Sequence, residues 1–384
     1  MKLALVRQKY NPFGGAERFV DRALQALRAQ GAAVTLITRE WKDADEAGRN
    51  VYGVRICNPS WFTRRERDTG FARAVQQIVA SGEFDLVQSH ERIPGVHLYR
   101  AGDGVHATWL ELRARAQSSL AQLATRLHPW HLYTLAAEAA MFRHPQLRAV
   151  ICNSEMVKRD IAARYGVAET KLQVIHNGVD LGYFHPGLRA ELRNRTRDAL
   201  NIPAKSPLLL FVGSGFERKG VGPLLRALAA MQNPEAHLVV VGRDKKQAAM
   251  EKLAAMLGVA HRTRFVGGQS DVRPYYAAAD VFALPTLYDP FPNAALEALA
   301  CGLPVMTSPT SGAAELVTPA CGAVVDALDH GAQATALDRL IEDPLAMRHA
   351  ARAAAETCSL DNMTEQLTAL YSTLTPSITE LPRA

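Results

Sequence analysis

Two acidic residues, Asp289 and Glu297, stand eight positions apart in the segment PTLYDPFPNAALEALACGLPVMTS, which covers residues 285–308. Asp289 lies in a proline-rich loop, and Glu297 lies about one turn inside the helical run that follows. We expect Asn293 to cap this helix, because asparagine is a favoured N-cap residue. A carboxylate there could accept hydrogen bonds from a polyol, while free N–H groups of the first turn face an anion. An ordinary acidic loop residue and an exposed helical glutamate would also explain the pair.

Two neighbouring cations, Arg218 and Lys219, lie within a second unusual segment, LLLFVGSGFERKGVG, which begins at residue 208. An apolar strand ends there, and Gly213 and Gly215 lead the chain away from it. Cations beside glycines at the carboxyl end of a strand suit a diphosphate, because arginine binds phosphate oxygens bidentately and lysine adds a point charge. The P-loop pattern GxxxxGK[ST] is absent, so ATPase chemistry of that kind is not indicated.

The first half of the chain offers weaker candidates. Gly14 and Gly15 make a tight turn between a strand and a helix, which allows a ligand to approach closely but often serves packing alone. His90 follows a strand directly, at the end where open α/β sheets place ligands. Asp103 lies in a loop between Gly102 and Gly104. We expect His90 and Asp103 to touch a substrate; a surface histidine and a capping aspartate are the alternatives.

Both halves repeat the order strand, glycine or polar turn, helix. This order predicts an α/β protein with two doubly wound parallel sheets. The expected strands are 2–7, 33–38, 54–57, 84–89, 149–153, 172–175, 208–212, 237–241, 264–266 and 281–284. The expected domains are 1–176 and 206–355, joined by a polar, arginine-rich linker at 177–205 and followed by a C-terminal helix and tail at 356–384. We also expect residues 337–374 to be helical.

The composition excludes some classes of protein. No apolar run reaches the roughly 20 residues that a bilayer requires, and the first ten residues do not form a signal peptide. The five cysteines show no CxxC spacing, which favours reduced thiols in a cytosol and no structural zinc. Residues 1–176 hold 25 Lys and Arg against 17 Asp and Glu, whereas the remainder holds 19 against 21. Nucleic acid, an anionic membrane, a phosphorylated substrate or a merely solvated surface would each explain the basic half.

The stretch 108–143 is helical by composition and mixes arginine and histidine with tryptophan and leucine. Such a stretch can lie in a membrane interface, and a core helix with one wet face is the alternative. A second aromatic and basic pairing occurs in WFTRR at residues 61–65.

The ordered set FGGAE, HNGVD, GSGFERKG and YDPFPNAALEALACGLPVMTS resembles the retaining family-4 glycosyltransferases. The resemblance covers nearly the whole chain. It implies a GT-B fold, in which two Rossmann-like domains face a cleft and the C-terminal helix crosses back to the first domain. The stretches NPFGGAERF, IPGVHLYRAGD and GSGFERKGV are similar to the enzymes that add glucose from UDP-glucose to a heptose of the lipopolysaccharide core.

The resemblance also implies roles for individual residues. Arg218 and Lys219 would hold the donor diphosphate, and Glu297 would accept from the ribose hydroxyls. Asp289 would contact the donor sugar, although the family usually has glutamate there, which leaves the choice of sugar open. Asp103 would act in catalysis beside the acceptor. The implied donor-binding set is Gly15, Gly213, Arg218, Lys219, Gly242, Arg243, Val266, Asp289, Phe291, Pro292, Asn293, Ala294 and Glu297, and the implied acceptor-binding set is Arg18, His90 and Asp103.

A UDP-sugar would be a substrate, and no metal or other cofactor is expected, because no DxD-like pair or histidine cluster is placed to hold Mg²⁺. The expected partners are a lipopolysaccharide-type acceptor and an anionic membrane surface met by the basic first half, without nucleic acid. The implied location is the cytoplasmic face of a bacterial inner membrane. Two alternatives stand beside this hypothesis. UDP-GlcNAc 2-epimerases share the fold, but no acid/base set like theirs is visible. A non-catalytic basic binding protein would leave the acids and cations unexplained.

Overall fold

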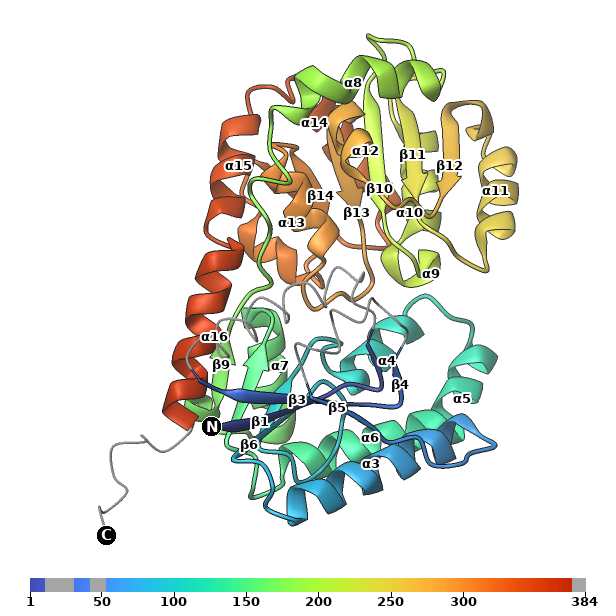
Figure 1. Ribbon diagram of the computed structural model, residues 1–384. Helices are drawn as coiled ribbons and strands as arrows, with labels where there is room; N and C mark the ends of the chain where they lie inside the picture. The colour runs from blue at the N-terminus through green and yellow to red at the C-terminus, as the bar shows by residue number, and fades with distance from the viewer. Residues whose placement is uncertain (11–30, 42–52, 375–384) are drawn as a thin grey trace. The chain divides into compact units, whose positions relative to one another are not determined.

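The protein forms two compact units in a computed structural model that describes residues 1–10, 31–41 and 53–374 (Figure 1). Unit 1 comprises Met1–Asn177 together with Asp361–Ala384, and unit 2 comprises Gly178–Leu360. Each unit is an α/β structure built around its own parallel sheet. The chain therefore leaves unit 1 once and returns to it with its last helix.

Unit 1 contains a seven-stranded parallel sheet in the order β5-β3-β1-β6-β7-β8-β9. Its strands are β1 Lys2–Val6, β3 Ala33–Thr38, β5 Gly53–Ile56, β6 Leu86–Ser89, β7 Leu98–Arg100, β8 Ala149–Cys152 and β9 Leu172–Val174, and a separate parallel pair is formed by β2 Lys9–Tyr10 and β4 Glu40–Trp41. The helices of this unit are α3 Arg64–Ala80, α4 His106–Ala114, α5 Ser119–Leu127, α6 Pro129–Phe142, α7 Glu155–Tyr165, the 3₁₀ turn η1 Glu169–Lys171 and α16 Leu360–Leu374.

Unit 2 contains a six-stranded parallel sheet in the order β12-β11-β10-β13-β14-β15. Its strands are β10 Leu208–Val212, β11 His237–Val241, β12 Thr263–Gly267, β13 Val281–Leu284, β14 Val305–Thr307 and β15 Gly322–Val324. Its helices are α8 Leu188–Ala199, α9 Phe216–Lys219, α10 Val221–Ala230, α11 Gln247–Met256, α12 Arg273–Ala278, α13 Asn293–Ala300, α14 His330–Glu342 and α15 Arg348–Glu356, with 3₁₀ turns η2 Ala260–Arg262 and η3 Gly312–Leu316.

The apolar strands of unit 2 are buried on both faces. The runs LLLFV, HLVVV and VFAL lack an alternating polar pattern, which is typical of parallel strands covered by helices on each side. Helix α10 buries Val221, Leu224, Leu225 and Leu228, and this spacing gives one apolar stripe against the core. The carboxyl ends of these strands are therefore held by a tightly packed sheet.

The last helix returns to unit 1, as the sequence predicts. Before it, the amide of Val179 donates to the carbonyl of Cys358 at 2.9 Å, and the amide of Leu360 donates to the carbonyl of Val179 at 3.1 Å. Within unit 1, the buried hydroxyl of Tyr371 on α16 donates to Oε1 of Gln88 on β6 at 2.6 Å. No helix in the described part of the chain is long and apolar enough to cross a membrane.

The expected helical structure over 337–374 is confirmed, and the structure divides it into the end of α14, then α15 and α16. Pro344 follows the last residue of α14 by two positions, and a proline there disfavours continuation of the helix. The second break, at residues 357–359, lies where Val179 pairs with the chain.

The stretch expected as a linker, 177–205, carries helix α8, and its arginines are held by one carboxylate. Arg189 and Arg193 lie 3.0 and 2.9 Å from Oδ1 of Asp280, and Arg197 lies 2.6 Å from its Oδ2. The amide of Leu208 also donates to Oδ2 of Asp280 at 3.0 Å. The side chain of Arg197 is 1% exposed, so this cluster fixes α8 against the start of the central strand of unit 2.

Asp280→Asn should destabilise unit 2 by about 3–5 kcal/mol, because it leaves buried guanidinium groups without their carboxylate. Differential scanning calorimetry should show the transition of unit 2 shifted to lower temperature. Glu83→Gln is the matched control, since it removes the carboxylate of the solvent-exposed Arg55–Glu83 pair and should change the profile little. Equal profiles for the two variants would show that the Asp280 cluster does not hold α8.

Candidate functional site

The glycine loop after β10 leaves room for the side chain of Lys219. A Cβ atom on Gly213 would lie 2.8 Å from Cδ of Lys219, which is closer than side chains approach one another. A Cβ atom on Gly242, at the end of β11, would lie 2.0 Å from the carbonyl oxygen of Gly213. Glycine at both positions therefore lets two strand ends and the lysine pack together.

The cations of this loop face the first of the two acids. Nζ of Lys219 lies 3.3 Å from Oδ2 of Asp289, and Nη1 of Arg218 lies 3.9 Å from the same oxygen. Nη1 of Arg218 also donates to the carbonyl of Tyr288 at 3.1 Å. The side chains of Lys219 and Asp289 are 15% and 9% exposed, whereas Arg218 is 38% exposed. The lysine is thus held in an ion pair, and the arginine keeps a larger surface toward solvent.

The loop that carries Asp289 is fixed by its backbone. The amide of Leu287 donates to the carbonyl of Arg218 at 2.8 Å, which ties the loop to α9. The amide of Asp289 donates to the carbonyl of Thr310 at 3.1 Å, and its carbonyl accepts from the amide of Gly312 at 2.9 Å. Segments that are far apart in the sequence therefore determine where this carboxylate points.

The second acid, Glu297, is held by a buried tyrosine. The hydroxyl of Tyr276 donates to Oε2 of Glu297 at 2.8 Å and lies 3.1 Å from the carbonyl oxygen of Ala294. Burial raises the pKa of Tyr276 well above its usual range, and the adjacent Glu297 carboxylate adds to this shift. Tyr276 therefore remains a hydrogen-bond donor, which orients Glu297. The expected cap is wrong: Asn293 is the first residue of α13, and Pro292 occupies the N-cap position without a side-chain cap bond.

Asp244 positions the glycine loop, although no motif in the sequence indicated this role. Its Oδ2 accepts from the amides of Gly215 and Phe216 at 2.9 and 3.0 Å, and its Oδ1 accepts from the amide of Lys246 at 2.7 Å. Burial alone would raise the pKa of Asp244, but these three donors outweigh it and lower the pKa. The first amides of α9 are therefore already occupied by a carboxylate, and Arg218 and Lys219 remain as the groups that can attract an anion.

The remaining predicted donor residues lie near the same ends of the strands. The side chain of Arg243 lies against Gly268, where an added Cβ would be 3.7 Å from its Nε. The carbonyl of Val266, near the end of β12, accepts from Nε2 of Gln269 at 2.6 Å. Phe291 is 4% exposed and packs in the core of unit 2. The structure thus brings Gly213, Lys219, Arg218 and Asp289 together, whereas Arg243 and Val266 follow the neighbouring strands.

In unit 1, His90 directly follows β6. Its ring Nε2 lies 3.2 Å from Nε2 of Gln88, whose Oε1 accepts from Tyr371 on α16. Burial lowers the pKa of His90 well below its usual range, and the nearby cations Arg7 and Arg100 lower it further. The imidazole is therefore neutral near pH 7, and the amide of Gln88 is placed to donate to it.

Asp103 is exposed, and the backbone that follows it is held by Arg92. Arg92 in turn is bound by the buried carboxylate of Glu138. Nη2 of Arg92 donates to the carbonyl of Gly104 at 2.8 Å, and Nε of Arg92 donates to Oε1 of Glu138 at 2.7 Å. Glu138 is fully buried and also accepts from the amide of His106 at 2.8 Å. Burial opposes ionisation of Glu138, but Arg92 and these hydrogen bonds lower its pKa. The sequence contained no local signal for this role of Glu138.

Two predicted site residues, Gly15 and Arg18, lie outside the described residues. Among the residues that the structure does describe, no group of three or more His, Cys, Asp or Glu side chains lies where it could hold a metal ion.

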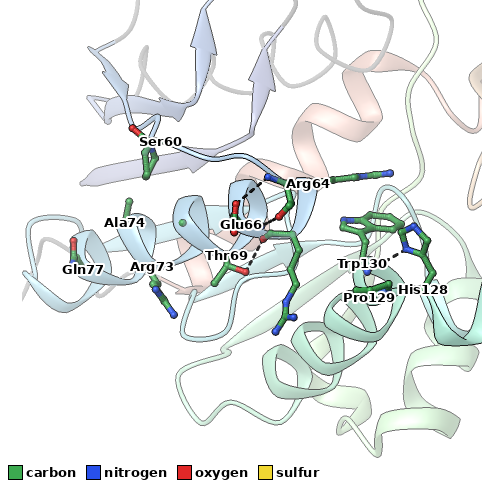
Figure 2. A pocket seen from close by; sticks show the side chains of 14 residues that line it. Ser60, Arg64, Glu66, Thr69, Arg73, Ala74, Gln77, His128, Pro129 and Trp130 are labelled. Carbon is green, nitrogen blue, oxygen red and sulfur yellow. Dashed lines mark hydrogen bonds between the residues drawn. The ribbon is translucent and has the colours of Figure 1, made fainter.

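A separate basic groove of about 1100 Å³ lies along α3 and the start of α6 in unit 1 (Figure 2). Arg64 extends over Trp130, with its guanidinium carbon 3.4 Å from the ring centroid. Nε1 of Trp130 donates to Oδ2 of Asp68 at 2.8 Å, which fixes the ring. Arg65 and Arg73 also line this groove. None of the acids or cations predicted from the sequence as site residues belongs to it.

Gly213→Ala should destabilise the protein by about 1–3 kcal/mol, because its methyl group would overlap Cδ of Lys219. The double variant Gly213→Ala/Lys219→Ala should recover part of this loss, since it removes the overlapping atom. Calorimetry on the two single variants and the double variant gives the coupling free energy. Strictly additive losses would contradict the proposed close approach between these residues.

Comparisons with known proteins find glycosyltransferase family models in both halves of the chain. A family model described as glycosyl transferases group 1 matches residues 193–357, and one described as glycosyltransferase family 4 matches residues 13–183. The lipopolysaccharide glucosyltransferase WaaG of Escherichia coli (strain K12) is 29% identical over 329 residues, which cover 85% of each chain. A D-inositol 3-phosphate glycosyltransferase of Mycobacterium sp. (strain KMS) is 30% identical and covers 90% of this chain and 82% of its own.

Solved structures show the same architecture. The crystal structure of WaaG, a glycosyltransferase involved in lipopolysaccharide biosynthesis, matches with a TM-score of 0.80 at 26% identity and covers 96% of this chain and 99% of its own. HepE from Anabaena, solved in complex with UDP-glucose, has the same fold with a TM-score of 0.71 at 21% identity, over 97% of this chain and all of its own. On its motifs, its two parallel-sheet units and these relatives, the chain belongs to the family-4 glycosyltransferases of the GT-B fold.

Proposed function

We propose that this glycosyltransferase moves a hexose, glucose in the first instance, from a UDP-sugar to a heptose hydroxyl of a lipopolysaccharide core, with retention of the α configuration. The observation that carries the proposal is the cluster of Arg218, Lys219 and Asp289 at the strand ends of unit 2. It supplies two cations for a diphosphate and one carboxylate for sugar hydroxyls. The printed names of WaaG and of the HepE complex support the acceptor and the donor, respectively.

The donor would be bound by unit 2. Arg218 and Lys219 neutralise the charge that develops on the departing UDP, and such electrostatic stabilisation is commonly the largest catalytic contribution. Because Arg218 is the more exposed cation, it can turn toward the phosphate without breaking a buried pair. Glu297, oriented by Tyr276, would accept from the two ribose hydroxyls. The two cations take the place that a metal ion has in other transferases, so metal independence remains a prediction.

The acceptor would be bound by unit 1. Asp103 is exposed on a loop that Arg92 and Glu138 hold in place, and its carboxylate would orient the acceptor hydroxyl. Neutral His90 could exchange hydrogen bonds with a sugar without adding charge. No side chain among the described site residues is placed as an obvious covalent nucleophile. We therefore favour attack on the same face that the UDP leaves, with the leaving phosphate accepting the proton of the acceptor hydroxyl.

A panel of UDP-sugars, assayed for UDP release with and without a heptose-containing acceptor, tests the proposal. We expect acceptor-dependent release from UDP-glucose and an α-linked product. Glu297→Ala should weaken UDP binding by about 10- to 150-fold, because two charge-assisted hydrogen bonds contribute roughly 1.5–3 kcal/mol. Formation of a second UDP-sugar without acceptor would instead identify an epimerase. Unchanged UDP affinity in Glu297→Ala would refute the ribose role.

We further propose that unit 1 meets the anionic inner face of a bacterial inner membrane through α5. The nine residues of this helix include none that is buried, and Leu120, Leu123 and Leu127 are 82%, 55% and 65% exposed. Leucines at this spacing form one apolar stripe, and Arg126 lies beside it. Helix α6, another part of the stretch expected at an interface, instead buries Met141 and Phe142 in the core.

Flotation with vesicles that contain anionic lipid should recover the wild-type protein at low salt and less of it at high salt. The double variant Leu120→Ser/Leu123→Ser should lose this binding while keeping transfer to a soluble acceptor. Met256→Ser, which removes an exposed apolar side chain from unit 2, is the control. Equal flotation of all three proteins would exclude α5 as the membrane contact.

A further inference from the structure

Arg39 is a buried arginine at the carboxyl edge of the sheet of unit 1. It directly follows β3 and is 2% exposed. Its Nε and Nη2 donate to Oδ1 of Asn58 at 3.2 and 2.8 Å. Its third nitrogen, Nη1, is buried and has no hydrogen-bond partner among the residues that the structure describes. A buried donor without an acceptor is costly, especially on a charged group, so the guanidinium needs a further partner.

Three carboxylates act electrostatically on Arg39, namely Glu40, Asp68 and Glu91, and each already has another partner. Glu40 lies 3.5 Å from Nζ of Lys9. Asp68 accepts from Nε of Arg67 at 2.8 Å and also from Gln8 and Trp130. Glu91 accepts from the amide of Gln8 at 3.0 Å. Burial lowers the pKa of Arg39 and Arg67 lowers it further, while Glu40, Asp68 and Glu91 only partly offset this. Because burial is the largest cause of the lowered pKa, an acceptor for the unpaired Nη1 would stabilise the charged form of Arg39.

The surroundings of Arg39 also include a partly exposed aromatic ring, that of Trp61. The guanidinium carbons of Arg39 and Arg67 lie 5.5 and 5.8 Å from the ring centroid of Trp61, so the ring stacks near two cations. Trp61 is 43% exposed, and an exposed aromatic face packs well against the apolar face of a sugar ring. This part of unit 1 thus places the buried charge of Arg39 beside the partly exposed ring of Trp61.

One residue connects Arg39 to the candidate acceptor residues. The carbonyl of Gln8 accepts from the amide of Arg39 at 3.1 Å, while the amide of Gln8 donates to Glu91. Glu91 follows His90 and lies within the electrostatic influence of Asp103. An anion on Arg39 would therefore bind beside the part of unit 1 to which the acceptor is assigned.

We propose that Arg39, with Trp61 beside it, binds a phosphate ester or carboxylate substituent of the acceptor glycan and so selects anionic acceptors. The inference rests on the proposed function, which assigns the acceptor to unit 1. The binding group is the Nη1–H of Arg39, and Arg67 adds positive potential. The donor diphosphate has its own cations in unit 2, so the two anions of the reaction are recognised by different arginines.

Kinetics with three acceptors tests this selection: one phosphorylated, one carboxylated and one with neither group. Arg39→Met should raise the KM for the charged acceptor that the wild type prefers by about 10- to 100-fold, with kcat changed much less. The KM for the neutral acceptor and for the UDP-sugar should stay the same. Arg73→Gln, which removes a cation from the groove between α3 and α6, is the matched control. Equal KM changes for charged and neutral acceptors would overturn the proposal.

A binding measurement separates this site from the transferase proposal. With the donor site saturated by UDP, inorganic phosphate should raise the melting temperature of the wild type and of Arg73→Gln, relative to chloride at equal ionic strength. It should not raise that of Arg39→Met. Loss of the shift in Arg39→Met, without any sugar transfer by the wild type, would contradict the proposed function and support the anion site. An equal shift in all three proteins would overturn the anion site even if transfer occurs.

Because Arg39→Met also loses both bonds to Asn58, its folding should be checked by circular dichroism. If the variant does not fold, competition in the wild-type enzyme decides. At saturating UDP-sugar, inorganic phosphate should then inhibit competitively against the charged acceptor and not against the neutral acceptor. Absence of competition with the charged acceptor would overturn the proposal.

Discussion

The ion pair between Lys219 and Asp289 joins the two loops on which the site in unit 2 depends. The lysine ends α9, after the first strand of the unit, and the aspartate follows the fourth. The lysine reaches the aspartate only because Gly213 has no side chain, and the aspartate is directed by backbone bonds to residues near 310. A change in either loop therefore moves the other, so the positions of the lysine and the aspartate are coupled.

Each unit uses a protein carboxylate to hold the amides of a loop that follows a strand. In unit 2, Asp244 accepts from the first amides of α9, and in unit 1 Glu138 accepts from the amide of His106 at the start of α4. The partial positive charge of these helix ends is thereby neutralised by carboxylates of the protein itself. Recognition of a negatively charged ligand would then depend on arginine and lysine side chains such as Arg218, Lys219 and Arg39.

Much of the fold could be predicted because parallel strands that are buried on both faces leave long apolar runs in the sequence. The expected strands 208–212, 237–241 and 281–284 agree with β10, β11 and β13 to the residue. Strand β7, Leu98–Arg100, was missed because three residues beside a polar stretch show no periodic pattern. Asp244 and Glu138 were missed for a different reason: each acts on amides that lie 28 to 32 residues away, and only the fold brings them together.

The short side chain at position 289 has a consequence for specificity. The related enzymes that the motif resembles usually have glutamate there, which can bend toward a sugar independently of its backbone. Asp289 has one fewer methylene group, its backbone is bound on both sides, and its carboxylate lies 3.3 Å from Lys219. Under the proposed roles, its reach would be limited to sugar hydroxyls close to the lysine, and a sugar that draws the carboxylate away would also weaken the ion pair. The choice of sugar and the binding of the diphosphate would thus be coupled through one oxygen atom.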